Sequence, residues 1–128
     1  MTGRALVLAI LAAGLAITAP AHAGEARVIA AEAKENGDGT FRVSATVEHA
    51  DEGWDHYANA FEVIGPEGEV LGTRVLAHPH VTEQPFTRTL GRVAVPEGVA
   101  RVSVRAVDSV HGPGSEGFAL DLPGRASD

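Results

Sequence analysis

Residues 36–49, NGDGTFRVSATVEH, decide the fold because they join a tight turn to a strictly alternating strand. In the turn 36–39, Asn and Gly tolerate the positive φ angles that hairpin turns need. From Thr40 onward every second residue is apolar, which is the period of a strand with one buried face. The residues on the apolar side are Phe41, Val43, Ala45 and Val47. The segment therefore predicts a half-buried strand over 40–49 that follows a hairpin turn.

The same pattern of short apolar runs between turn residues continues through the rest of the chain. Gly, Pro, Asn and Asp separate the runs, as is typical of all-β domains. The candidate strands are 26–33, 40–49, 54–64, 69–77, 86–93, 99–108 and 117–122, although the first of them would also suit a helix. About seven such strands predict an all-β, immunoglobulin-like sandwich, nearest in spacing to the fibronectin type III variant. We expect Trp54 to lie in its core.

The N-terminus shows the three regions of a cleavable secretory signal in the expected order. Arg4 supplies a positive charge, residues 5–17 are apolar, and Ala21-His22-Ala23 is a small-x-small cleavage site. The apolar run is shorter than the about 20 residues that a membrane-spanning helix needs. The expected organisation is a signal peptide over 1–23, a sandwich domain over 24–122 and a flexible tail over 123–128. This predicts a periplasmic or secreted protein with no membrane span after cleavage.

The composition narrows the classes of function. The 128 residues include no cysteine, which excludes a disulfide, a thiolate metal site and a cysteine nucleophile. The formal net charge of −7 argues against nucleic acid, whose phosphates attract clustered Lys and Arg. No Gly-x-Ser-x-Gly motif occurs, and Ser109 between Asp108 and Val110 is better explained as a turn residue than as a nucleophile. We therefore expect a protein that is not an enzyme.

Five histidines follow residue 23, and the predicted topology gathers them at one end of the sandwich. A hairpin closing with Ile64 opposite Glu69 places Asp55 opposite His78. Strand 99–108 would lie antiparallel to strand 54–64, so its C-terminal end reaches the same place. The five are His49, His56, His78, His80 and His111.

Imidazole and carboxylate groups that meet at the rim of a core can hold Zn²⁺ or Cu²⁺. His78 and His80, two residues apart on a strand, would point the same way. The predicted ligands are His56, His78, His80, His111, Asp55 and Asp108, with His49 and Glu83 as additional candidates. The alternative is a hydrogen-bonded loop network without a metal, in which the aspartates accept backbone N–H groups.

Two classes of function follow from these observations. One is an exported protein that binds copper or zinc through the histidine and aspartate cluster. The other is an immunoglobulin-like interaction module that binds a protein or envelope component through its loops or a sheet edge, without a metal.

Three strings carry a resemblance to small exported immunoglobulin-like proteins of Gram-negative bacteria. They are GWDHY at 53–57, HPHVTEQPF at 78–86 and DSVHG at 108–112. This resemblance implies no particular activity. In size, export and histidine use the chain is also similar to the copper-resistance C family of periplasmic copper-binding sandwiches. That family begins its mature chain with His-x-His, whereas cleavage after Ala23 leaves Gly24 first.

Overall fold

The alternating segment forms the central strand of a three-stranded sheet. In the computed structural model, which describes residues 25–125, this segment is β2 (Thr40–Glu48). It pairs antiparallel with β1 (Arg27–Glu35) on one side and with β5 (Phe86–Ala94) on the other. The side of β2 that the sequence predicts to be apolar is buried along its whole length. The first candidate segment forms a strand and not a helix.

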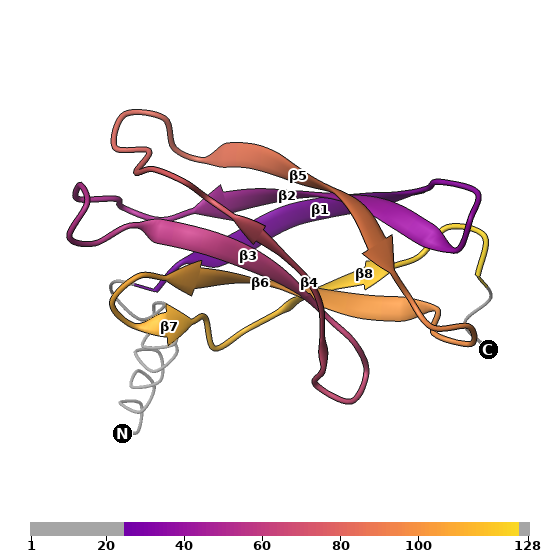
Figure 1. Cartoon of the computed structure of the whole chain (residues 1–128). Helices are drawn as coiled ribbons and strands as arrows, with labels where there is room; N and C mark the ends of the chain where they lie inside the picture. Colours follow the sequence, from indigo (N-terminus) through magenta and orange to yellow (C-terminus); the bar gives the residue numbers. More distant parts are fainter. Residues whose placement is uncertain (1–24, 126–128) are drawn as a thin grey trace, which may run out of the picture.

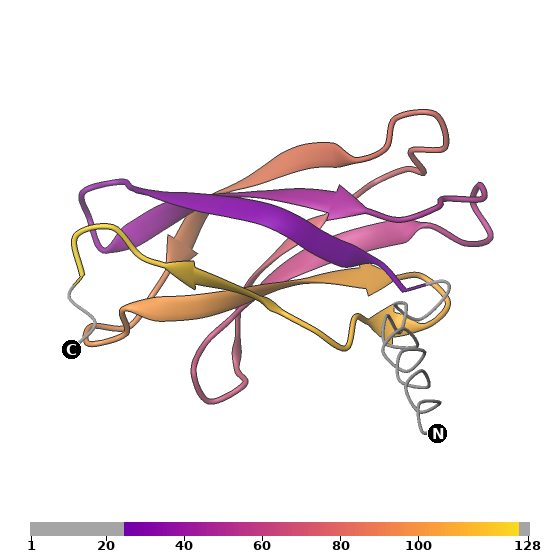
Figure 2. The same ribbon diagram turned by 180° about the vertical axis from the view of Figure 1, so that it is seen from behind.

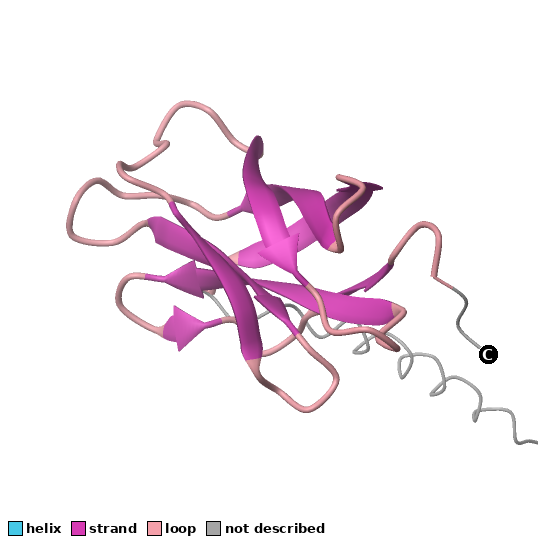
Figure 3. Cartoon of the chain, turned by 45° about the vertical axis from the view of Figure 1, so that its right-hand side comes forward, coloured by secondary structure: helices cyan, strands magenta, loops and turns pink. Residues whose placement is uncertain are grey.

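The remaining strands form the second sheet. In it β3 (Ala58–Ile64) lies between β4 (Val70–Val75) and β6 (Arg101–Asp108), and every pairing is antiparallel. The far side of β6 also pairs with β7 (Gly112–Pro113) and with β8 (Phe118–Asp121). Figures 1 and 2 show the two sheets as separate layers, seen from opposite sides. Figure 3 shows only strands and loops in the described residues.

The predicted immunoglobulin-like, fibronectin type III-like sandwich is confirmed. The sheet orders β1-β2-β5 and β4-β3-β6-β8 place the first, second and fifth strands in one layer, and the others in the second layer. Eight strands occur among the described residues where about seven are expected, and the difference is the two-residue β7. The core lies between the layers, where Phe41 of β2 and Phe61 of β3 are fully buried.

The β3–β4 hairpin has a different register from the predicted one. Ile64 pairs with Val70 rather than with Glu69, and Phe61 pairs with Arg74. The loop is therefore longer than expected, and a bulge just before Ile64 shifts the rest of the pairing by one further residue. A total shift of two residues leaves each side chain on its expected face, because side chains alternate with period two.

The predicted strand over 54–64 begins too early, because its first part is a turn. The N–H of Glu52 donates to the carbonyl of His56 at 2.8 Å, and β3 starts only at Ala58. Trp54 lies in this turn and is 67% exposed, so its predicted place in the core is wrong. Asp55 is also exposed in the turn, so it cannot form the predicted cross-strand pair with His78.

The predicted signal peptide and its cleavage site fall within residues 1–24, which lie outside the described residues, as do residues 126–128. The first residues of the predicted tail are described. There the guanidinium of Arg125 donates to the backbone carbonyls of Pro96 at 2.7 Å and Val99 at 3.0 Å. Over residues 25–125, no helix has the length and hydropathy needed to cross a membrane.

Candidate metal centre

Asp108 is the centre of the candidate site. It is the last residue of β6 and continues the buried face of that strand, so its carboxylate points inward and is fully buried. Its Oδ1 accepts the backbone N–H groups of Val110 at 2.7 Å and His111 at 3.0 Å, which closes the following turn. Burial opposes ionisation, but these two N–H groups and the rings of His56 and His111 hold the pKa of Asp108 well below its usual range.

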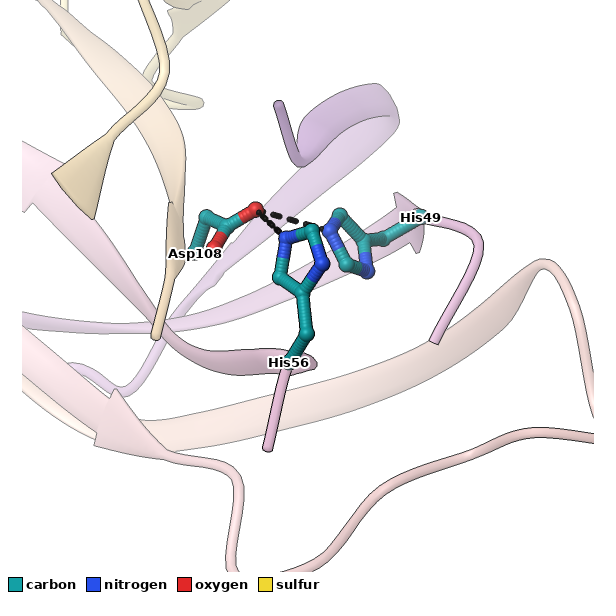
Figure 4. A group of neighbouring side chains, drawn as sticks. All are labelled: His49, His56 and Asp108. Atoms are coloured by element: carbon teal, nitrogen blue, oxygen red, sulfur yellow. Dashed lines mark hydrogen bonds and ion pairs between the residues drawn. The ribbon is translucent and has the colours of Figure 1, made fainter. Parts of the chain in front are cut away.

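Three imidazole rings converge on the other oxygen of the same carboxylate. Asp108 Oδ2 lies 2.8 Å from His49 Nε2, 2.8 Å from His56 Nε2 and 3.2 Å from His111 Nδ1. Figure 4 shows the rings of His49 and His56 pointing at this oxygen from two different segments. His49 directly follows β2, His56 ends the turn before β3, and His111 precedes β7. The end of the sandwich thus brings together residues that lie up to 62 positions apart in sequence.

Two further carboxylates form hydrogen bonds with the other nitrogen, Nδ1, of two of these rings. Asp51 Oδ1 lies 2.6 Å from His49 Nδ1, and Glu52 Oε1 lies 3.1 Å from His56 Nδ1. Histidines that bind metals usually have their other ring nitrogen held by a carboxylate or a carbonyl in this way. The arrangement therefore fixes the orientation of both rings and directs both Nε2 atoms toward Asp108.

The hydrogen positions follow from these contacts. Ionised carboxylates only accept hydrogen bonds, so a ring that bonds one on each side carries hydrogen on both nitrogens. This applies to His56, whose side chain is 17% exposed. Hydrogen bonds that the ring donates to Asp108 and to Glu52, in that order of effect, raise the pKa of His56 above its ordinary value of 6.5. A metal bound at Nε2 would take the place of one of these hydrogens.

The donor set is suited to a transition metal. One atom each from His49, His56 and Asp108 lie within 4.8 Å of one another, so this group could hold an ion. His111 adds a third imidazole on the side of Asp108 Oδ2. Metal–ligand bonds of about 2.0–2.1 Å place the donor atoms of a tetrahedral site about 3.3 Å apart. The nitrogen–oxygen separations here, 2.8–3.2 Å, approach that spacing.

His78 and His80, two of the predicted ligands, lie outside this group. The ring of His80 stacks on Phe86 with the centroids 3.9 Å apart, and its Nε2 accepts a hydrogen bond from Arg88 at 3.0 Å. Burial first, then the charges of Arg88 and His78, lower the pKa of His80. The His78 ring is exposed, and its Nδ1 donates to the carbonyl of Pro79 at 3.1 Å. These two histidines form a separate pair whose ring centroids are 4.6 Å apart.

The other predicted acids are also apart from the group. Asp55 is exposed in the turn before β3, and Glu83 forms an exposed ion pair with Arg88 at 3.3 Å. Asp51, which was not among the predicted ligands, is instead buried and joins the two histidine groups. Its Oδ2 accepts the backbone N–H of His80 at 2.6 Å.

The sequence contains a signal that could have found the central role of His49. The buried positions of β2 are 41, 43, 45 and 47, and one more step of that alternation points residue 49 into the core. Asp51 and Glu52 offer no comparable signal, because a turn brings them to the rings and turns do not follow a fixed period.

The fold and the site together define a β-sandwich with a buried histidine and aspartate cluster that could hold a metal ion. Over 103 residues, 80% of this chain, the sequence is 37% identical to a protein of Halomicrobium mukohataei named “Putative lipoprotein”. The aligned part is 50% of that protein, so the chain spans about half the length of this relative. No protein-family model matches the chain. No solved structure matches it either.

Proposed function

We propose that this protein binds one divalent transition metal ion, copper or zinc, through His49, His56, His111 and Asp108. The observation that carries the proposal is the convergence of three imidazole nitrogens on a single carboxylate oxygen, Asp108 Oδ2. Zn²⁺ and Cu²⁺ both favour imidazole nitrogen with carboxylate help, whereas Mg²⁺ and Ca²⁺ favour sites made of oxygen atoms.

The outer contacts support a metal over a network of hydrogen bonds alone. Without a metal, the contacts around Asp108 need several hydrogen-bearing ring nitrogens to crowd one oxygen atom. A divalent ion replaces those hydrogens and leaves His49 and His56 as neutral ligands, each donating its Nδ1 hydrogen to a carboxylate. That is the usual outer shell of a bound metal.

The number of ligands favours binding over catalysis. With His111 beside the group of His49, His56 and Asp108, four protein ligands are available for a tetrahedral site, whereas catalytic zinc sites usually keep one position for water or substrate. We propose a role in holding or carrying the ion at the cell envelope, in the periplasm or outside. The predicted secretory signal and the name of the Halomicrobium relative support this location. The sequence resemblance to exported proteins of Gram-negative bacteria agrees with it.

A second candidate function is an immunoglobulin-like interaction module. Large apolar side chains are exposed on three loops at the histidine end: Trp54 at 67%, Val81 at 56% and Val110 at 58%. Exposed apolar groups at one end of a domain can contribute to a protein contact. This function requires a protein or envelope partner and no metal.

Metal titration separates the two candidates. Zn²⁺ or Cu²⁺ added to the metal-free protein must raise its melting temperature, by an amount equivalent to about 2.7 kcal/mol at a hundredfold excess over the dissociation constant. Calorimetry should give one ion per chain. Replacing His56 with alanine should remove most of the effect, and replacing the exposed His78 should leave it intact. If neither ion changes the melting temperature at neutral pH, the metal proposal is wrong and the interaction module takes its place.

A further inference from the structure

The four proposed ligands differ sharply in exposure. The side chains of Asp108 and His49 are 0% and 1% exposed, that of His56 is 17% exposed, and that of His111 is 48% exposed. The most exposed ligand is also the most distant one. His111 Nδ1 lies 3.2 Å from Asp108 Oδ2, against 2.8 Å for each of the other two rings. The site therefore has a closed side and an open side.

The closed side is held by contacts that do not depend on a metal. Asp51 holds the ring of His49 at 2.6 Å, and Gln84 Oε1 accepts the backbone N–H of His49 at 3.0 Å. Two backbone N–H groups hold Asp108. An ion seated against these groups cannot be approached from the core. The open side is formed by a short turn, residues 109–111, that lies on the surface.

We infer that His111 is the exchangeable ligand, through which the ion enters and leaves, while His49, His56 and Asp108 form the permanent part of the site. The inference rests on the proposed function. The exchange is a ligand substitution: the bond from the ion to His111 Nδ1 breaks as a bond to an incoming donor forms, and no electron is transferred. The incoming donor is a nitrogen or oxygen ligand of a chelator or of an acceptor molecule at the surface.

Two variants, each of which replaces one histidine ligand with alanine, test the inference. In His111→Ala the missing imidazole leaves a gap at the surface, whereas in His56→Ala the gap lies in the more enclosed part of the site. Zn²⁺ is loaded onto each purified protein, and its transfer to a chromophoric chelator is followed by stopped-flow absorbance. His78→Ala is the matched control, because His78 is an exposed histidine at the same end that lies outside the group.

The expected results differ for each variant. His111→Ala should still bind one Zn²⁺ but lose it at least about tenfold faster than the unmodified protein, since changes in affinity act mainly through the dissociation rate. Free imidazole in solution should restore slow release, because it can occupy the exposed gap. His56→Ala should lose most binding and should not recover with imidazole. His78→Ala should match the unmodified protein.

The outcomes also separate this inference from the proposed function. If the unmodified protein binds no Zn²⁺, the proposed function fails. If it binds Zn²⁺ and His111→Ala releases the ion at the unmodified rate, His111 is not the exchangeable ligand. The inference also fails if imidazole restores binding equally to His56→Ala. A melting curve of each metal-free variant shows that any change in release comes from a folded protein.

Discussion

At the scale of single residues, one carboxylate organises the site. Asp108 Oδ1 closes a turn through two backbone N–H groups, and Oδ2 receives three imidazole rings. The pKa of Asp108 is held well below its usual range by those backbone groups and rings, against the opposing effect of burial. The carboxylate is therefore ionised throughout the neutral range and can act as a metal ligand without first losing a proton.

Asp51 orients the His49 ring without being one of the proposed ligands. Replacing Asp51 with asparagine removes its charge with little change in shape. In Asp51→Asn, the ring of His49 loses the carboxylate that holds its Nδ1. We expect the affinity for Zn²⁺ to fall about 10- to 100-fold, the usual cost of losing a group that orients a metal ligand. Calorimetric titration measures the affinity. Asp55→Asn, which removes an exposed charge at the same end, should leave it unchanged.

The raised pKa of His56 predicts opposite responses to pH in the metal-free and metal-bound protein. Its hydrogen bonds to Asp108 and Glu52 favour the protonated ring. Without a metal, this contribution to stability is fully present below the unfolded pKa of about 6.5 and is lost as pH rises through the higher folded value. Zn²⁺ needs the neutral ring, so its affinity should instead rise with pH.

Melting temperatures between about pH 5.5 and 8.5, with a chelator and with excess Zn²⁺, check both trends around the ordinary pKa of His. The metal-induced increase in melting temperature should grow with pH. In the metal-free His56→Gln variant, the melting temperature should depend less on pH, because the contribution of the His56 ring is gone. An increase in melting temperature that is constant or larger at low pH contradicts the assignment of His56 as a ligand.

At the scale of elements, the C-terminal ends of β2 and β6 place His49 and Asp108 in the site. The buried positions of β2 lead by alternation to His49, and those of β6 lead to Asp108. β2 and β6 belong to different sheets, so the two residues meet across the core. The regular strands thus supply the closed side of the site. The turn at residues 52–56 adds His56, and the turn at residues 109–111 supplies the open side.

The aromatic residues of the β3 region should respond to substitution in opposite ways. Phe61 on β3 is fully buried between the sheets, so Phe61→Ala should lower the free energy of unfolding by about 3–5 kcal/mol. Trp54 is 67% exposed, so Trp54→Ala should change it by no more than about 0.5 kcal/mol. Urea denaturation of both variants measures the difference. A large loss in Trp54→Ala would place that side chain in the core after all.

At the scale of the whole molecule, a bound ion would link the two sheets at one end. His49 follows a strand of the first sheet, and Asp108 ends a strand of the second. Binding to the folded state alone should raise the urea midpoint. The slope of the unfolding free energy against urea should stay the same, because the surface exposed on unfolding is unchanged. A change of slope would instead mean that the metal alters the compactness of the folded or unfolded chain.

Much of the fold could be predicted because its signal is local. The alternation of residues 40–49 and the turn at 36–39 predict β2 and the hairpin before it, and both form. Errors arose where the backbone leaves its regular period. A longer loop and the bulge before Ile64 each shifted the β3–β4 register by one residue. The turn at 52–56 took Trp54 out of the core and Asp55 away from its expected partner.

By itself, the sequence determined the all-β sandwich, the buried face of its central strands and the gathering of histidines at one end. Only the tertiary structure decided which histidines meet. It brings His49, His56 and His111 to Asp108 and leaves His78 and His80 against Phe86 and Arg88. The physical reason is that strand periodicity depends on neighbours along the chain. The direction of a loop side chain depends instead on bulges, turns and hydrogen bonds to residues far away in sequence.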